Sequence, residues 1–144
     1  MGLGELSIRV YYQDTDSGGI VFHAAYLEFF ERGRTEWLRD LGITQGELNH
    51  ELGVLFVVRK VNLRYLKPAF LDDLLLVRTS VLKIGKAQIT LCQKVFRDKD
   101  LLMNGIVNLG LISTDTLQPK IIPDRIRGKL ILSSGSCSVK TEET

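Results

Sequence analysis

The residues best placed to do chemistry lie in one short stretch near the N-terminus. Asp14 and Asp16 stand where a strand pattern stops, Gly18-Gly19 follows them, and His23 comes after three apolar residues. A carboxylate that is partly withdrawn from water has a raised pKa and becomes a better nucleophile or general base. We therefore interpret Asp16 as the first candidate for catalysis, although Asp before two glycines is also ordinary turn chemistry. One of the two carboxylates could bind loop amides while the other reacts.

His23 stands where a long helix is expected to begin. The first backbone N–H groups of a helix have no partner within the helix, so this end of a helix favours negative charge. The amides of His23 and the two residues after it are therefore suited to hold the oxyanion that forms when a carbonyl carbon is attacked. A histidine at this position can equally cap the helix or pack beside it.

Three further charged residues are candidates for substrate binding. Glu31 falls at the margin of the apolar side of the expected helix, where it could reach a pocket between the helix and a sheet or simply pair with Arg34 or Thr35. Lys83 and Lys86 flank Gly85 in an expected turn. Ammonium groups placed in this way can bind phosphate, although lysines are also common in surface turns.

A long amphipathic helix and a sheet are expected to position these groups. Residues 24–41 have apolar side chains at helical spacing over one wide side, and residues 6–13 alternate as a strand does. Thr44 and Glu47 have the spacing of a capping box, which predicts a short second helix near 45–52. Further strands are predicted at 54–67, 74–83, 87–97 and 101–113. This order predicts an α+β domain with one antiparallel sheet and a helix on one face.

The size and composition of the chain are typical of a single globular domain. It has 144 residues, of which 44% are hydrophobic, and a formal charge of +2. We expect one domain over 1–132 and a disordered polar tail over 133–144. The absence of a basic run gives little support for nucleic-acid binding. Without a signal peptide pattern or an apolar segment of about 18 residues, no membrane span and a cytoplasmic location are expected.

The two cysteines, Cys92 and Cys137, give no sign of a metal site. Their spacing matches neither a set of metal ligands nor a disulfide framework. We therefore expect two free thiols and no bound metal.

Specific residues of the N-terminal stretch carry a resemblance to a known family. They are Arg9-Val10, Thr15-Asp16, Gly19-Ile20-Val21, His23-Ala24, Tyr26 and the helical run 29–37. Over about residues 6–130 the chain closely resembles the hotdog-fold acyl-CoA thioesterases of the 4-hydroxybenzoyl-CoA thioesterase type, nearest to their bacterial Tol-Pal-associated branch. The resemblance implies an α+β hotdog fold, in which a five-stranded antiparallel sheet wraps around one long helix. It also implies homodimers or homotetramers with active sites at the dimer interface.

The resemblance implies an enzyme that hydrolyses the thioester of an acyl-CoA to free acid and CoA, with no cofactor. The family's catalytic carboxylate falls on Asp16, and the amide that polarises the thioester carbonyl falls on His23. The family's substrate-binding positions, which include an acid of the acyl pocket and a basic loop for the CoA phosphates, fall on Tyr26, Glu31, Lys83 and Lys86. One difference is Ala25, where related sequences usually have Asn.

A thioester suits this set of residues. Its leaving thiol has a pKa of about 8.5, so neither a metal nor a strong general acid is needed. Asp16 either attacks the carbonyl to give a mixed anhydride or activates water, and both routes stay open. Two other functions also stay open. One is an enoyl hydratase or dehydratase that uses His23 with Glu28 or Glu31, and the other is a protein that binds acyl-CoA or acyl carrier protein without turnover.

Overall fold

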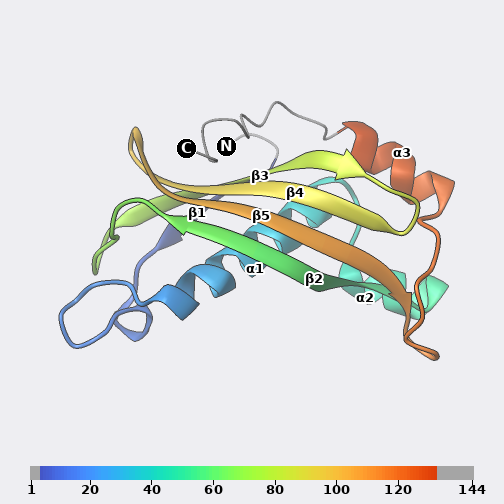
Figure 1. Cartoon of the computed structure of the whole chain (residues 1–144), viewed down its shortest axis with the longest axis horizontal. Coiled ribbons are helices and arrows are strands. Elements are labelled where there is room, and N and C mark those ends of the chain that lie inside the picture. The colour runs from blue at the N-terminus through green and yellow to red at the C-terminus, as the bar shows by residue number, and fades with distance from the viewer. Residues whose placement is uncertain (1–3, 133–144) are drawn as a thin grey trace.

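The computed structural model describes residues 4–132 of the chain, so the tail expected at 133–144 lies outside the described residues. Figure 1 shows one twisted sheet with the long helix α1 lying along one of its faces. The elements in chain order are β1 (Glu5–Arg9), η1 (Tyr12–Asp14), α1 (His23–Asp40), α2 (Gln45–Glu47), η2 (Leu48–Leu52), β2 (Val54–Tyr65), β3 (Leu74–Ile84), β4 (Gln88–Arg97), β5 (Asp100–Ser113) and α3 (Asp124–Leu132).

The five strands form one antiparallel sheet in the order β1-β3-β4-β5-β2. The chain thus has the predicted α+β architecture, with five antiparallel strands and a long helix on one face. The connections after β3 and β4 are short, as antiparallel neighbours require. Strands β1 and β2 form the two edges of the sheet, so each has one side without a partner strand within residues 4–132.

Helix α1 begins and ends within one residue of its predicted bounds, because its wide apolar side packs on the sheet. Phe29, Phe30, Trp37 and Leu38 are all buried. Gly33 lies on the same side, and a Cβ atom there would stand 2.7 Å from Cγ1 of Val77 on β3. The helix backbone therefore approaches the sheet more closely at Gly33 than any larger residue would allow.

Strand β1 is shorter than predicted, and the helix predicted near 45–52 forms over that span as two consecutive elements. Strand β1 ends at Arg9 and not at residue 13, because the chain turns into η1, where Asp14 Oδ2 accepts a hydrogen bond of 2.9 Å from the N–H of Tyr11. Helix α2 ends at Glu47 and continues as the wider turn η2. The predicted N-cap is present, since Thr44 Oγ1 accepts a bond of 3.1 Å from the N–H of Glu47.

Helix α3 was not expected from the sequence. It buries Ile126 and Leu130 in the same apolar cluster as Trp37 and Ile122. Only two of its nine residues are buried. The segment is therefore too short to show the recurring apolar positions that predict a helix. Its place is set by packing at one end of the sheet (Figure 1).

Two expectations drawn from composition can be compared with the structure. Cys92 is buried in β4 and is disulfide-bonded, so the expectation of a free thiol at this position is wrong. Cys137 lies outside the described residues. None of the helices within residues 4–132 is long and apolar enough to cross a membrane.

Candidate active site

Residues 15–21 form a small hairpin, called here the Asp16 hairpin. Thr15 pairs with Val21 across it, and the N–H of Asp16 donates to the carbonyl of Ile20 at 2.9 Å. Gly19 has a φ of 78°, a left-handed conformation that glycine adopts without a steric penalty. The glycine that marked a loop in the sequence therefore makes this tight hairpin possible.

The two carboxylates of this region have different surroundings. Asp14 is buried, and its bond from the N–H of Tyr11 holds the turn η1. Asp16 is exposed, and its Oδ1 accepts hydrogen bonds from the N–H groups of Gly18 at 2.8 Å and Ile20 at 3.3 Å. Of the pair, Asp14 is thus the buried loop-holding residue. The partial desolvation expected for Asp16 is not provided within this chain.

The Asp16 hairpin lies against the connection between β2 and β3, called here the β2–β3 loop (residues 66–73). The N–H of Val21 donates to the carbonyl of Ala69 at 2.9 Å, and the N–H of Leu71 donates to the carbonyl of Gly19 at 3.0 Å. Ile20 and Phe70 form an antiparallel bridge between these two bonds. The hairpin is therefore held as an extra strand on a loop that lies about fifty residues further along the chain.

The start of α1 has no side-chain cap. Its N-cap residue is Phe22, whose side chain accepts no capping bond. The His23 ring does not cap the helix but stacks on the ring of Tyr65 with 4.2 Å between centroids, and the Tyr65 hydroxyl donates to the His23 carbonyl at 3.4 Å. The amide end of the helix is thus left without a side-chain acceptor, and the imidazole serves as an aromatic contact.

A pocket of about 230 Å³ lies beside this helix end. Its walls are mostly apolar or aromatic and come from the Asp16 hairpin, α1, the end of β2 and the β2–β3 loop. The lining residues are Ile20, Val21, His23, Tyr26, Tyr65, Leu66, Lys67 and Pro68. The structure therefore brings two of the predicted site residues, His23 and Tyr26, into one pocket, and the hairpin of Asp16 forms one wall of it.

Tyr26 joins this pocket to the β2–β3 loop. Its hydroxyl oxygen accepts a hydrogen bond of 3.2 Å from the N–H of Ala69, and the residue is almost fully buried. Burial raises the pKa of the Tyr26 phenol above its usual 10.0 because the phenolate would lose its hydration. Tyr26 is therefore a neutral phenol at ordinary pH and contributes shape and a hydrogen bond.

Sequence reasoning did not find Tyr65 and Lys67, which also line the pocket. Tyr65 ends β2, and Lys67 pairs with Asp100 at 3.4 Å in an exposed position. Both lie about forty residues from His23, so only the pairing of β2 with β5 brings them there. A tyrosine near the end of a predicted strand was the one feature of the sequence that could indicate a pocket here, and it is a weak indication.

Glu31 lies in a different groove. Its Oε2 accepts a hydrogen bond of 2.7 Å from the hydroxyl of Thr35, one helical turn further along. The groove has a volume of about 520 Å³ and runs between β1 and α1, with residues such as Ile8, Arg9 and Glu36 in its walls. Within this chain Glu31 therefore does not face the pocket of His23 and Tyr26.

Lys83 and Lys86 lie together at the β3–β4 turn but far from this pocket. Lys83 faces Thr90 across the strands, and both lysines are exposed. Leu111 of β5 forms a backbone hydrogen bond with the β3–β4 turn. Leu102 of β5 forms backbone hydrogen bonds with the chain just after β2, beside the pocket. Nine residues of strand span roughly 30 Å. One chain alone does not bring the lysines to the pocket.

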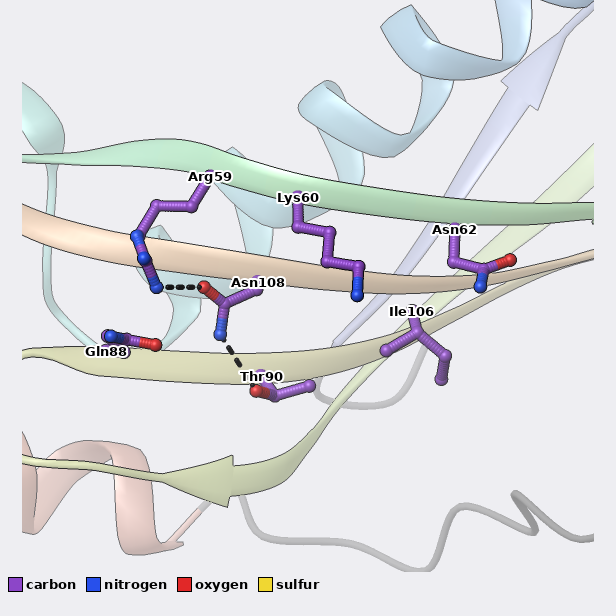
Figure 2. Close-up of a pocket in the computed structure, with 7 residues that line it drawn as sticks. All are labelled: Arg59, Lys60, Asn62, Gln88, Thr90, Ile106 and Asn108. Atoms are coloured by element: carbon purple, nitrogen blue, oxygen red, sulfur yellow. Dashed lines mark hydrogen bonds between the residues drawn. The ribbon is translucent and has the colours of Figure 1, made fainter.

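A further groove of about 570 Å³ lies on the sheet face turned away from α1 (Figure 2). Arg59 Nη1 donates to Asn108 Oδ1 at 3.1 Å, and Asn108 Nδ2 donates to Thr90 Oγ1 at 3.1 Å. Its lining residues are Arg59, Lys60, Asn62, Gln88, Thr90, Ile106 and Asn108. None of the predicted site residues lines it, and it has no carboxylate, imidazole or helix end to act on a carbonyl.

Metal-assisted chemistry receives no support from the arrangement of possible ligands. Within residues 4–132, no three His, Cys, Asp or Glu side chains come together in a way that could hold a metal ion.

Comparisons with known proteins show the family of this chain. The family model described as the thioesterase superfamily matches residues 18–104. The acyl-CoA thioesterase YbgC of Haemophilus influenzae is 41% identical over 120 residues, which cover 83% of this chain and 88% of that protein. The acyl-CoA thioester hydrolase YbgC of Escherichia coli O157:H7 is 39% identical over 121 residues, covering 83% and 89%.

A solved structure extends the comparison to the fold. The crystal structure of a probable thioesterase from Bartonella henselae superimposes with a TM-score of 0.79 at 35% sequence identity, covering 83% of this chain and 98% of that one. The chain therefore belongs to the thioesterase superfamily and is a thioester hydrolase with the hotdog fold.

Proposed function

We propose that this chain hydrolyses the thioester bond of an acyl-CoA to a free acid and CoA, with Asp16 as the reacting carboxylate. The names of the relatives support acyl-CoA as the substrate. The observation that carries the proposal is the Asp16 hairpin, which is held by hydrogen bonds on both sides and leads directly into the uncapped start of α1. A rigid carboxylate and a helix N-terminus are thus joined by a few residues of chain.

In the proposed reaction the thioester carbonyl points toward the first amides of α1, beginning at His23. As the carbonyl carbon becomes tetrahedral, these N–H groups stabilise the negative oxygen, and one such donor is worth about 3–4 kcal/mol. The apolar side chains of the pocket, such as Tyr65 and Ile20, exclude water from the acyl group. The thiolate leaves without help because its conjugate acid has a pKa of about 8.5.

Two routes start from Asp16. In the first, the carboxylate attacks the carbonyl carbon, the C–S bond breaks, and water then cleaves the mixed anhydride and restores the carboxylate. In the second, the carboxylate takes a proton from water as the hydroxide attacks. In a single turnover in labelled water, label in the Asp16 carboxylate identifies the first route, with water attacking the Asp16 carbonyl of the anhydride and releasing the acyl group as the free acid.

The remaining roles require a second copy of the chain. Lys83 and Lys86 are proposed to bind the CoA phosphates, and Glu31 to contact the acyl group, yet none of them shares the His23 pocket within one chain. A homodimer or homotetramer would place the lysines of one copy near the pocket of another. The unpaired edge of β2 is the proposed place of contact, because two such edges can join into one continuous sheet. An acyl carrier protein remains an alternative donor of the acyl group.

The test is the release of free thiol from a panel of acyl-CoAs by the wild-type protein and by Asp16→Asn. Asparagine keeps the size of the side chain and an acceptor oxygen for the hairpin amides. We expect turnover to fall at least about a hundredfold, which corresponds to about 2.7 kcal/mol. Equal turnover by both proteins would remove Asp16 from the mechanism.

The same assay distinguishes the two alternative functions. Tight binding of acyl-CoA without release of thiol would identify a binding protein. The local hydrogen bonds of the Asp16 carboxylate would then serve only to hold the loop. Addition of water to an enoyl-CoA without release of thiol would identify a hydratase.

A further inference from the structure

The β2–β3 loop holds both chain segments that lead to Asp16. On one side it carries the Asp16 hairpin through the carbonyl of Ala69 and the N–H of Leu71. On the other side it holds the end of β1, because Val10 exchanges backbone hydrogen bonds of 2.9 and 3.0 Å with Asp73 and Asp72. The position of Asp16 therefore depends on the position of this loop.

Arg97 contacts the β2–β3 loop at several points and ties it to the sheet, in addition to the exposed pair of Lys67 with Asp100. Arg97, the last residue of β4, uses Nη1 to donate to the Pro68 carbonyl at 3.1 Å and to Asp73 Oδ2 at 2.8 Å. Its guanidinium carbon also lies 5.8 Å from the centre of the Phe70 ring. The same Oδ2 of Asp73 accepts a bond of 2.9 Å from the N–H of Phe70. Arg97 thus contacts the start, the middle and the end of the loop.

The ion pair between Arg97 and Asp73 is partly shielded from water. The side chains of Arg97 and Asp73 are 25% and 21% exposed. An ion pair in such a position is less screened than a surface pair, and the planar guanidinium can engage a carboxylate, a carbonyl and a ring together. A lysine could replace only the charge.

We propose that Arg97 is a positioning residue for hydrolysis. It acts through a short chain of contacts, since Arg97 fixes Phe70, Phe70 pairs with Ile20, and Ile20 accepts the backbone N–H bond of Asp16. This inference rests on the proposed catalytic role of Asp16. A displacement of about 1 Å at a reacting group can reduce turnover by as much as a hundredfold, even when the cause lies outside the pocket.

The chain provides a matched control for Arg97. Arg78 on β3 also pairs with a carboxylate, at 3.0 Å from Glu5 Oε2, and its guanidinium carbon also lies over an aromatic ring, 4.8 Å from the centre of Phe96. These contacts of Arg78 involve neither the β2–β3 loop nor the Asp16 hairpin. Removing Arg78 therefore deletes the same kinds of contact, made by a more exposed side chain, at the far end of β1 from the Asp16 hairpin.

The experiment compares Arg97→Met, Arg97→Lys and Arg78→Met in the same thioesterase assay, with melting temperatures measured in parallel. We expect Arg97→Met to lower kcat about tenfold with little change in KM, Arg97→Lys to restore part of the loss, and Arg78→Met to keep wild-type kcat. Equal losses in Arg97→Met and Arg78→Met would overturn the proposal. If Arg97→Met does not fold, Arg97→Lys must still show a lower kcat than Arg78→Met, or the proposal fails.

A second comparison shows whether Arg97 acts through Asp16. In the Asp16→Asn protein, assayed at high enzyme concentration, Arg97→Met should cost little further turnover, because the group that it positions is already removed. A loss of the same size in both backgrounds would contradict the proposal. The outcome is separate from that of the proposed function, which fails if Asp16→Asn alone keeps wild-type turnover.

Discussion

Asp14 and Asp16 are two residues apart, but the fold gives them opposite roles. Asp14 is buried and its carboxylate holds the backbone of η1, whereas Asp16 is exposed at the tip of its hairpin. The buried Asp14 carboxylate stabilises the fold, because its removal would leave the N–H of Tyr11 without a hydrogen-bond acceptor. The exposed Asp16 carboxylate, whose Oδ1 accepts the bonds from Gly18 and Ile20, is the one proposed to act on the substrate.

This difference predicts opposite effects of two substitutions. Asp14→Ala leaves the N–H of Tyr11 without its acceptor, so we expect the free energy of unfolding to fall by about 1–3 kcal/mol. Asp16→Asn should change it by less than about 0.5 kcal/mol because the side chain is exposed and an acceptor oxygen remains. Urea unfolding followed by circular dichroism measures both. A larger loss in Asp16→Asn than in Asp14→Ala would reverse the assignment.

Tyr26 predicts a specific dependence of stability on alkaline pH. Its pKa in the folded protein is raised above 10.0, mainly by burial, so the folded state keeps this proton at a pH where the unfolded state loses it. The corresponding stability is present below pH 10 and is lost as the pH rises toward the folded pKa. We expect the wild type to lose more stability between pH 9 and 11 than Tyr26→Phe does. Parallel pH curves for the two proteins would exclude this contribution.

The long helix α1 is positioned as a unit by its close approach to the sheet at Gly33. A Cβ atom there would lie 2.7 Å from Val77 Cγ1 and 3.2 Å from Nε2 of the buried Gln93. Gln93 itself donates to the carbonyl of Phe30 at 3.0 Å and so ties the middle of the helix to β4. The start of α1, and therefore the proposed oxyanion site, depends on this contact.

A pair of alanine substitutions tests this contact. Alanine normally stabilises a helix over glycine by about 1 kcal/mol. We expect Gly33→Ala to destabilise the protein by about 1–3 kcal/mol in spite of this, because the added methyl group overpacks the interface. Gly128→Ala in α3, where nothing lies within 4 Å of the new Cβ, should show the ordinary gain. Thermal unfolding of both variants measures these effects. Stabilisation by Gly33→Ala would contradict the close approach of α1 to the sheet.

The whole molecule has its two groups of predicted functional residues at different ends of the sheet. Asp16 and His23 lie near the β2–β3 loop, while Lys83 and Lys86 lie at the β3–β4 turn, roughly 30 Å away along β5. A single CoA molecule could use both groups only if they came from different chains. The proposed homodimer therefore makes a prediction about mixed assemblies.

Mixed assemblies of two impaired variants should regain activity. Asp16→Asn chains keep the lysines, and chains with Lys83→Gln and Lys86→Gln keep the carboxylate. If each site combines Asp16 of one chain with the lysines of another, a mixed dimer has one intact site. We expect unfolding and refolding of an equal mixture to give more turnover at low acyl-CoA than the mean of the two separate proteins. Turnover equal to that mean would show that the lysines do not serve a neighbouring site.

The sequence alone determined most of the local elements of this protein, although not α3 or the end of β1. Helical spacing gave the bounds of α1 within one residue, and alternation with short turns gave β2 to β5 nearly complete. The capping bond of Thr44 was also predicted from its spacing. These features follow from interactions between residues that are close along the chain, so the pattern of residue types is sufficient to reveal them.

Only the tertiary structure decided which residues meet. Tyr65 stacks on His23 because β2 lies at the edge of the sheet beside β5, and Arg97 holds the β2–β3 loop because β4 ends next to it. Glu31 lies in a groove between α1 and β1 and not in the pocket of His23 and Tyr26, because β1 is the strand that packs beside that part of the helix. Strand order, register and packing join segments that are far apart in sequence, and a local pattern does not contain that information.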